Sequence, residues 1–141
     1  MSVENFLDTN LFIYQLDTED EAKSLIANRI IREGIYHGNA SISFQVVQEC
    51  LNSMLRKAQI CLTPVQTEQY LDASLKPLLR VYPSILLYKT SLRIQARYQF
   101  GFYDSLIIAA ALESGCTTLY SEDMQHDQQI ERLTIKNPFL D

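Results

Sequence analysis

The segment ENFLDTNLFIYQLD, residues 4–17, places a single carboxylate, Asp8, between two apolar runs. The first run, Asn5–Leu7, predicts a short buried strand, and the second, Leu11–Leu16, predicts a brief helical turn. A carboxylate between two buried segments is costly unless a partner or a ligand offsets its desolvation. The position of Asp8 therefore raises the question of which other charges join it.

Strand and helix patterns alternate along the rest of the chain. Further strands are expected at residues 40–43, 80–84, 117–121 and 133–139. Pro83 weakens the prediction of a strand at 80–84, and the strand at 133–139 is expected at an edge of the sheet. Helices are expected from a cap at Thr18 to near Gly34, over 44–58, from Thr63–Pro64 onward, over 85–100, and from Asp104, as cap or first residue, to Gly115. This alternation predicts an α/β domain with a mainly parallel sheet.

The bulk composition is that of one ordinary globular domain spanning residues 1–141, with 47% hydrophobic and 21% charged residues. The N-terminus has no basic region before Asp8, so no secretory signal is predicted. The longest apolar helix candidate, residues 106–112, is far shorter than the ~20 residues of a membrane span, so no membrane association is expected. Three cysteines without metal-type spacing predict reduced core thiols and a cytoplasmic protein.

Twelve basic and 17 acidic residues give a formal charge of −5, which argues against nucleic-acid binding through a basic surface. Four of the acids nevertheless fall where the carboxyl ends of parallel strands form a ligand-binding rim. Asp8 ends the first strand, and Asp123 follows the strand at 117–121. Glu49 lies in the helix after the second strand, and Asp104 lies at a helix start.

Four gathered carboxylates repel one another unless a cation compensates them. Mg²⁺ or Mn²⁺ prefers such oxygen ligands, and one or two ions of this kind can activate water for in-line attack on a phosphodiester. Setting the four acids against bound cations changes the formal charge of the remaining chain from −5 to −1. The pattern therefore predicts metal-dependent phosphodiester chemistry and weakens the objection from net charge.

Four stretches, FLDTNLFIY, SFQVVQECLNSM, FYDSLIIAAALESGC and TLYSEDMQHDQ, resemble in this order the motifs of the PIN-domain family. The ending LTIKNPF is similar to that family's last strand, and the chain as a whole resembles the VapC-type toxins of bacterial and archaeal toxin–antitoxin pairs. The resemblance spans essentially the whole chain, although residues 58–90 carry little motif information. It implies a three-layer α/β/α sandwich and a metal-dependent ribonuclease.

The resemblance assigns catalytic roles to all four acids, with Asp8 and Asp104 as direct metal ligands. The alternative for Asp104 is a plain helix cap, which is compatible with ligation. Glu49 acts as a ligand or as a base that orients water, unless it is only a solvated boundary residue. Asp123 reaches the metal directly, through water, or only when substrate is present. Ser121 stands where the family more often has Thr, and the hydroxyl is kept.

Several neighbouring polar residues are open to two interpretations. Asn10 and Ser121 are expected to donate hydrogen bonds that orient the carboxylates, and Thr9 either does the same or shapes the turn. Glu122 and Asp127 are expected to be solvated surface acids. For His126, an exposed helix histidine is favoured over an RNA contact or a general acid. His37, beside Gly38, is expected in a turn.

Basic and aromatic side chains provide possible RNA contacts. Arg93 and Arg97 lie one helical turn apart before Asp104, and Arg56 and Lys57 follow Glu49. Each is a candidate phosphate contact, with a solvated helix face as the ordinary alternative. Three tyrosines could stack on bases or simply pack at the core boundary: Tyr14, Tyr103 and Tyr120.

The leading hypothesis is an endoribonuclease toxin that uses Mg²⁺, with Mn²⁺ as a substitute. Its expected partners are RNA, a small antitoxin and a second copy of itself in a homodimer. One alternative is a PIN-domain enzyme outside any toxin pair that processes RNA or cuts single-stranded DNA. The other is a non-catalytic PIN fold that only binds RNA or protein.

Overall fold

The computed structural model describes residues 3–57 and 59–140, in which six strands form one sheet. The strand order is β3-β2-β1-β4-β6-β5, and every neighbouring pair is parallel except β5 with β6. The strands are β1 (Asn5–Leu7), β2 (Ala40–Ser43), β3 (Leu79–Val81), β4 (Thr118–Tyr120), β5 (Gln129–Ile130) and β6 (Leu133–Lys136). The predicted mainly parallel sheet is thus confirmed, with β1 and β2 at the expected residues.

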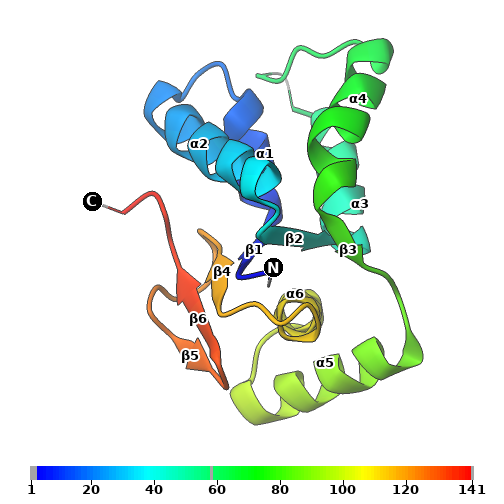
Figure 1. Cartoon of the computed structure of the whole chain (residues 1–141), viewed down its shortest axis with the longest axis vertical. Helices are drawn as coiled ribbons and strands as arrows, with labels where there is room; N and C mark the ends of the chain where they lie inside the picture. Colours follow the sequence, from blue (N-terminus) through cyan, green and yellow to red (C-terminus); the bar gives the residue numbers. More distant parts are fainter. Residues whose placement is uncertain (1–2, 58, 141) are drawn as a thin grey trace.

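Helices cover both faces of the sheet, with α1 and α2 on one side and α5 and α6 on the other (Figure 1). The helices are α1 (Thr9–Leu16), α2 (Glu21–His37), α3 (Phe44–Met54), α4 (Pro64–Tyr70), α5 (Ile85–Tyr98) and α6 (Phe102–Glu113). A π-helical segment, η1 (Leu71–Leu75), and a short 3-10 helix, η2 (Lys76–Leu78), continue α4 toward β3. This arrangement confirms the expected layered α/β/α architecture.

Helix α6 is the most deeply buried helix among the described residues. Its side chains from Ser105 to Leu112 are all buried, because it lies between α5 and the sheet. A helix that is apolar all round is typical of such a central position. On the neighbouring strands, Phe6 and Leu119 lie opposite each other in register and are fully buried. This core fixes the strand ends at which the candidate site forms.

The predicted limits of α2 were wrong at both ends. Asp20, not Thr18, caps the helix, and its side chain accepts a hydrogen bond from the backbone N–H of Lys23 at 3.1 Å. The helix continues past Gly34, where an added Cβ would lie only 2.6 Å from the Cβ of Ala40. Gly34 therefore serves the close approach of α2 to β2. The helix ends at Gly38, whose φ of 67° is left-handed.

Helix α6 begins two residues earlier than the sequence suggested. Gly101 occupies the cap position, so Asp104 lies inside the first turn and is neither the cap nor the first residue. A carboxylate in the first turn still interacts favourably with the helix dipole. Helix α5 ends at Tyr98 because Gln99 adopts a left-handed conformation with φ of 63°.

The last predicted strand, β6, is not at the edge of the sheet. It pairs with β4 on one side and with the two-residue strand β5 on the other. The sequence did not reveal β5, because Gln129–Ile130 is too short to show any periodicity. The edge position therefore belongs to β5.

Two of the three cysteines match the expected core role, since Cys50 and Cys116 are buried, whereas Cys61 is exposed. Across the described part of the chain, none of the helices is long and apolar enough to cross a lipid bilayer.

Candidate functional site

A pocket of about 340 Å³ lies where β1, α3, α6 and the segment after β4 meet. We call it the acidic pocket, because the four carboxylates picked out from the sequence all line it. The described residues that form it are Asp8, Thr9, Asn10, Gln45, Glu49, Asn52, Ser53, Tyr103, Asp104, Ile107 and Asp123. Folding thus brings together acids that lie more than 110 residues apart in the chain.

Asp8 is the buried centre of the acidic pocket, with only 8% of its surface exposed. It caps α1, and its Oδ1 accepts a hydrogen bond from the backbone N–H of Thr9 at 2.7 Å. Its Oδ2 accepts a hydrogen bond from the hydroxyl of Ser121 at 2.8 Å. Because Ser121 directly follows β4, the ends of two adjacent strands orient this carboxylate.

The two residues after Asp8 each contact another carboxylate of the pocket. The hydroxyl of Thr9 donates to Oε1 of Glu49 at 2.7 Å, and the amide of Asn10 donates to Oδ2 of Asp123 at 2.8 Å. The short segment after β1 therefore connects three of the four acids. Of the two roles open for Thr9, the structure shows the hydrogen bond to a carboxylate.

Gln45 is a pocket residue that the sequence interpretation missed. It is 4% exposed, and its Nε2 donates to Oε2 of Glu49 at 3.4 Å and to the backbone oxygen of Tyr103 at 3.2 Å. Its own Oε1 is buried without a hydrogen-bond partner. The available signal was the spacing, since Gln45 and Glu49 lie four residues apart on one face of α3.

Burial and mutual repulsion raise the pKa values of two of the four acids. The pKa of Asp8 rises to about 6, mainly through desolvation and further through the charges of Glu49 and Asp123, against hydrogen bonds from Thr9 and Ser121. Asp104 is exposed on one side, yet partial desolvation and the charges of Asp123 and Glu49 also raise its pKa. None of the described pocket residues is a lysine, arginine or histidine that could compensate this charge.

The donor set of the acidic pocket suits a hard divalent cation, because it consists of carboxylate, hydroxyl and amide oxygens. Within residues 3–57 and 59–140, however, no three acidic, histidine or cysteine side chains converge as a finished metal site. In this arrangement the carboxylates of Asp8, Glu49 and Asp123 are hydrogen-bonded to neutral donors instead. The pocket therefore fits a cation by chemistry and charge, and binding would require the carboxylates to draw closer.

The basic residues considered as RNA contacts lie outside the acidic pocket. Arg93 and Arg97 are exposed on α5, whose inward-facing residues include Ser91 and Ile94. The guanidinium of Arg97 lies 5.4 Å from the ring centre of Tyr98. Two further basic residues, Arg56 and Lys57, are exposed beyond the end of α3 and do not line the pocket.

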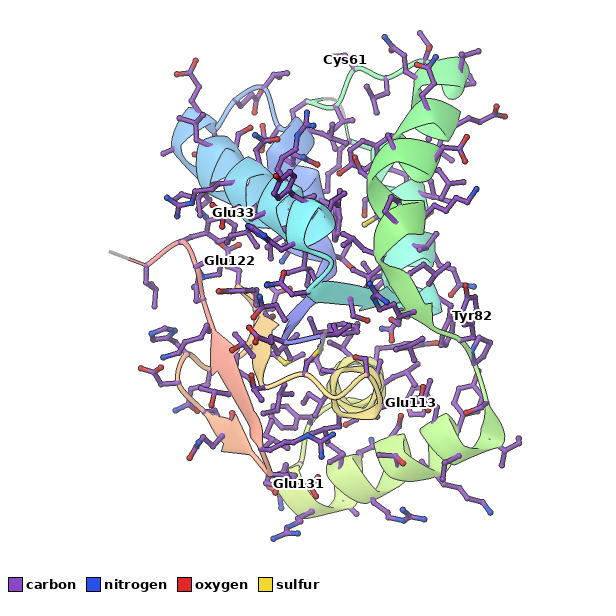
Figure 2. The ribbon with its side chains drawn as sticks, in the orientation of Figure 1. Glu33, Cys61, Tyr82, Glu113, Glu122 and Glu131 are labelled. Atoms are coloured by element: carbon purple, nitrogen blue, oxygen red, sulfur yellow. The ribbon has the colours of Figure 1, made fainter. Side chains whose placement is uncertain are left out.

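Glu122 is not the solvated acid that was expected. Its side chain is 22% exposed and lies between α2 and the C-terminal segment (Figure 2). It accepts hydrogen bonds from the hydroxyl of Tyr14 at 2.7 Å and from the ammonium group of Lys23 at 2.5 Å. Burial alone would raise the pKa of Glu122, but these two donors outweigh it and lower the pKa. We call Tyr14, Lys23 and Glu122 the Glu122 cluster.

His126 lies in a turn before β5 and not on a helix, as had been expected. Its Nδ1 accepts a hydrogen bond from the backbone N–H of Asn137 at 3.0 Å. The neighbouring Asp127 is exposed, as predicted, and is paired with Lys136. His37 was expected in a turn but is the last residue of α2, and the turn begins at Gly38.

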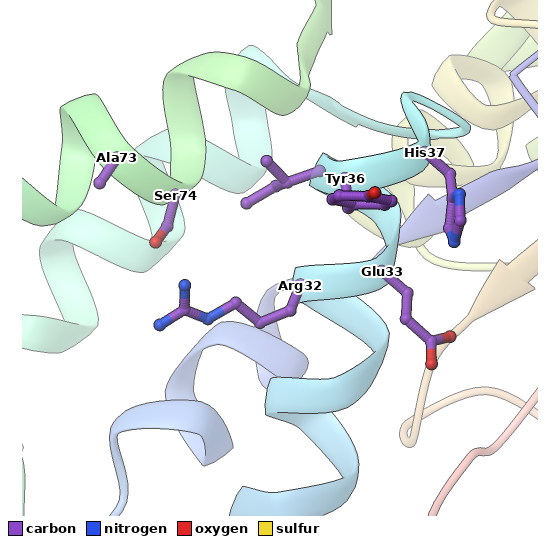
Figure 3. A pocket seen from close by; sticks show the side chains of 7 residues that line it. Arg32, Glu33, Tyr36, His37, Ala73 and Ser74 are labelled. Atoms are coloured by element: carbon purple, nitrogen blue, oxygen red, sulfur yellow. The ribbon is translucent and has the colours of Figure 1, made fainter.

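A larger pocket of about 530 Å³ lies between α2 and η1 (Figure 3). Arg32 extends from α2 toward the side of η1 that carries Ser74, and the ring of Tyr36 lies nearby (Figure 3). Glu33 is the only acid among the described residues that line it. The carboxylates thus gather in the smaller pocket, and that pocket is the better candidate for chemistry.

Comparison with known families and structures bears on the family and the fold of the chain. The family model described as "PIN domain" matches residues 6–130, which is most of the chain. No curated protein matches the sequence.

Seventeen chains of solved structures are similar to this fold. A toxin–antitoxin complex from Klebsiella pneumoniae has a TM-score of 0.67 at 16% identity, covering 96% of this chain and 98% of the other. FitAcB from Neisseria gonorrhoeae has a TM-score of 0.66 at 16% identity, with the same coverage. A toxin from Mycobacterium tuberculosis that cleaves the sarcin–ricin loop has a TM-score of 0.61 at 16% identity, covering 85% and 90%. At this identity the likeness concerns the fold.

Proposed function

The chain belongs to the PIN domain family, and we propose that it is a ribonuclease that hydrolyses phosphodiester bonds with the help of Mg²⁺ or Mn²⁺. One observation carries the proposal: four carboxylates from separate segments share a pocket in which none of the described lining residues is basic. Such uncompensated charge is costly for a folded protein. A bound cation would compensate this negative charge and would in turn bind the phosphate of a substrate.

In this proposal Asp8 and Asp104 hold the cation, from the end of β1 and the first turn of α6. When bound, the cation supplies activation of water and neutralisation of the charge that develops on the phosphate. Asp123 completes the negative rim and is oriented by the amide of Asn10. Ser121 fixes the orientation of Asp8 through its hydrogen bond.

Glu49 is the proposed general base. Hydrogen bonds from Thr9 and Gln45 orient its carboxylate. It accepts a proton from the attacking water while the water oxygen bonds to phosphorus. The bond from phosphorus to the leaving sugar oxygen then breaks, that oxygen takes up a proton from solvent water, and Glu49 returns its proton to solvent. This is the ordinary balance of a phosphodiester hydrolysis assisted by a base.

We further propose that the enzyme is the cytoplasmic toxin of a toxin–antitoxin pair and acts as a homodimer. The similarity to a toxin–antitoxin complex and to a toxin that cleaves the sarcin–ricin loop supports this assignment. Expression of the chain should arrest bacterial growth, and co-expression of a small protein encoded by the adjacent gene should relieve the arrest. Arrest that persists with the variant Asp104→Asn would speak against a nuclease toxin.

The test of the activity is cleavage of total cellular RNA and of a defined oligonucleotide by the purified protein. Wild-type protein should cut RNA only when Mg²⁺ or Mn²⁺ is present, and Asp104→Asn should lower the rate by at least about 100-fold. Asp72→Asn is the matched control, because Asp72 is exposed on η1 and outside the acidic pocket. This control should cleave RNA at the wild-type rate.

The same assay separates the alternatives. Cleavage of a DNA strand of the same sequence at an equal rate would favour a nuclease that is not specific for RNA. Cleavage that survives EDTA or the Asp104→Asn change would refute the mechanism. Calorimetry that detects no Mn²⁺ binding to the wild-type protein would favour a non-catalytic binding module.

A further inference from the structure

Tyr103 presents a largely exposed aromatic ring at the mouth of the acidic pocket. It is 67% exposed, lines the pocket and directly precedes Asp104 in the first turn of α6. Its ring meets that of Phe102 edge to face, with ring centres 5.3 Å apart and planes at 83°. A tyrosine ring that is exposed beside a pocket of carboxylates contributes little to the core and is available to a partner outside the chain.

The backbone that carries this ring is anchored to the opposite wall of the pocket. The backbone oxygen of Tyr103 accepts a hydrogen bond from Nε2 of the buried Gln45 at 3.2 Å. The same nitrogen contacts Glu49 at 3.4 Å. The backbone that carries the ring is therefore held close to the carboxylates where the chemistry is proposed to occur.

The other two tyrosines that the sequence pointed to are already engaged within the fold. The hydroxyl of Tyr14 donates to Glu122 at 2.7 Å, and its ring lies 4.9 Å from that of Phe139. Tyr120 is half-buried and packs against the hydrophobic core. Among the three, Tyr103 is the one whose ring is mainly exposed to solvent and borders the acidic pocket.

Helix α3 contributes polar groups to the same pocket. Asn52 and Ser53 line it, three and four residues beyond Glu49, and so about one helical turn further along α3. An asparagine amide can both donate and accept hydrogen bonds at the edge of a base. The pocket thus combines an aromatic face, an amide and a group of carboxylates, which fits a nucleotide with its base next to the reacting phosphate.

Stacking also explains how a chain with a net negative charge could bind a nucleic acid. The chain carries a formal charge of −5, and none of the described pocket residues is basic, so attraction to phosphate cannot come from positive side chains there. Stacking of a base on an aromatic ring gives affinity that does not depend on positive charge, and it requires a base that is not paired in a helix.

We propose that Tyr103, supported by Phe102, is a stacking platform for an unpaired nucleobase next to the phosphate that is cleaved. The base that stacks on Tyr103 must be able to leave its own stack. This inference rests on the proposed nuclease function and adds a base-binding residue to the same site.

The test uses a short single-stranded RNA in which 2-aminopurine, a base whose fluorescence falls when it stacks, replaces each base in turn. With wild-type protein, fluorescence should fall at one position adjacent to the cleavage site. Tyr103→Phe keeps the ring and should preserve this signal. Tyr103→Ala and Tyr103→Leu should abolish it and raise KM about tenfold, with a smaller effect on kcat.

Tyr36→Ala is the matched control, because Tyr36 is 85% exposed but lines the other pocket. It should leave fluorescence and kinetics unchanged. An RNA duplex of the same sequence should be cleaved at least about tenfold more slowly than the single strand. Wild-type quenching and KM in the Tyr103→Leu protein, or equal cleavage of duplex and single strand, would overturn the platform.

The outcomes also separate this inference from the nuclease function. RNA cleavage that does not depend on the ring at position 103 would contradict the stacking role of Tyr103 and leave the proposed nuclease function standing. Quenching that depends on this ring, in a protein that cleaves no RNA with any cation, would support the stacking role and contradict the nuclease function.

Discussion

Two adjacent residues, Glu122 and Asp123, belong to acidic regions with opposite electrostatics. Glu122 accepts hydrogen bonds from Lys23 and Tyr14 within the Glu122 cluster. Asp123 lines the acidic pocket, where its hydrogen-bond donor is the neutral amide of Asn10. The Glu122 cluster compensates its carboxylate with the ammonium group of Lys23. The acidic pocket gathers four carboxylates, and none of its described lining residues is basic.

The pKa values express this difference. The donors around Glu122 lower its pKa, whereas burial and neighbouring charge raise the pKa of Asp8 to about 6 and also raise that of Asp104. The comparison shows that this fold can pair a carboxylate with a basic side chain of its own when the carboxylate stabilises the folded state. The acids of the pocket have no basic partner among the described lining residues. We propose that a cation bound from solution compensates their charge.

The largest expected effect on stability comes from Asp8→Asn in the metal-free protein. Asp8 titrates at about 6 when folded against 3.8 when unfolded, so its ionisation lowers the free energy of unfolding as pH rises between these values. The loss is complete above about pH 7 and amounts to at most about 3 kcal/mol. Asn keeps the oxygen that accepts from Thr9, so the variant should be more stable than wild type at pH 8.

Urea unfolding in EDTA at pH 4 and pH 8 measures this effect. The advantage of Asp8→Asn should be large at pH 8 and much smaller at pH 4, where Asp8 is protonated in the folded state and the unfolded carboxyl, with its pKa of 3.8, is only partly ionised. An equal difference at both pH values would show that the charge of Asp8 is not the cause.

Addition of Mn²⁺ should reverse the penalty in the wild-type protein. At a concentration about 100 times the Kd, a ligand that binds only the folded state adds about 2.7 kcal/mol to the free energy of unfolding. Differential scanning calorimetry should show this gain for wild type and for Asp72→Asn. The double variant Asp8→Asn with Asp104→Asn should gain nothing, and a gain like that of the wild type would place the cation elsewhere.

Glu122→Gln should act in the opposite direction to Asp8→Asn. The change removes the charge that Lys23 faces, and we expect a loss of about 1–2 kcal/mol at pH 7. Because the pKa of Glu122 is lowered by folding, its contribution is present at neutral pH and is lost as pH falls below its ordinary value of 4.5. Chemical unfolding of Glu122→Gln, Lys23→Met and the double variant measures the pair, and strict additivity of the two changes would argue against it.

The smallest effect concerns a buried polar group without any charge. The hydroxyl of Ser41 in β2 is buried and lacks a hydrogen-bond partner. Removing an unsatisfied buried hydroxyl is favourable, so Ser41→Ala should raise the free energy of unfolding by roughly 0.5–1 kcal/mol. A decrease in the urea midpoint would indicate that the hydroxyl does have a partner in solution.

The sequence predicted the parts of the fold that depend on local pattern. Asn5–Leu7 and Ala40–Ser43 were found as strands at the expected residues, because each is a short segment directly before a helix signal. The parallel arrangement then placed Asp8 and Asp123 at one rim. The four acids of the pocket could therefore be named in advance, although their catalytic roles remain proposals.

The contacts that sequence could not reveal depend on tertiary packing. Lys23 and Glu122 lie 99 residues apart, and neither position carries a pattern that pairs them. The end of α2 was misjudged because Gly34 serves helix–strand contact, while Gly38 alone has the left-handed φ that ends the helix. Gln45 was missed because a glutamine on a helix shows its hydrogen bonds only when its neighbours are in place.

The two edges of the sheet have a consequence for self-association. Strand β3 has three residues and is soon followed by Pro83. Strand β5 has two residues and is followed by Glu131, whose φ is positive. Edge strands this short offer few unpaired backbone groups to an incoming strand. Two copies of the chain should therefore not merge into one continuous β-structure, and any stable dimer is expected to join through its helical faces.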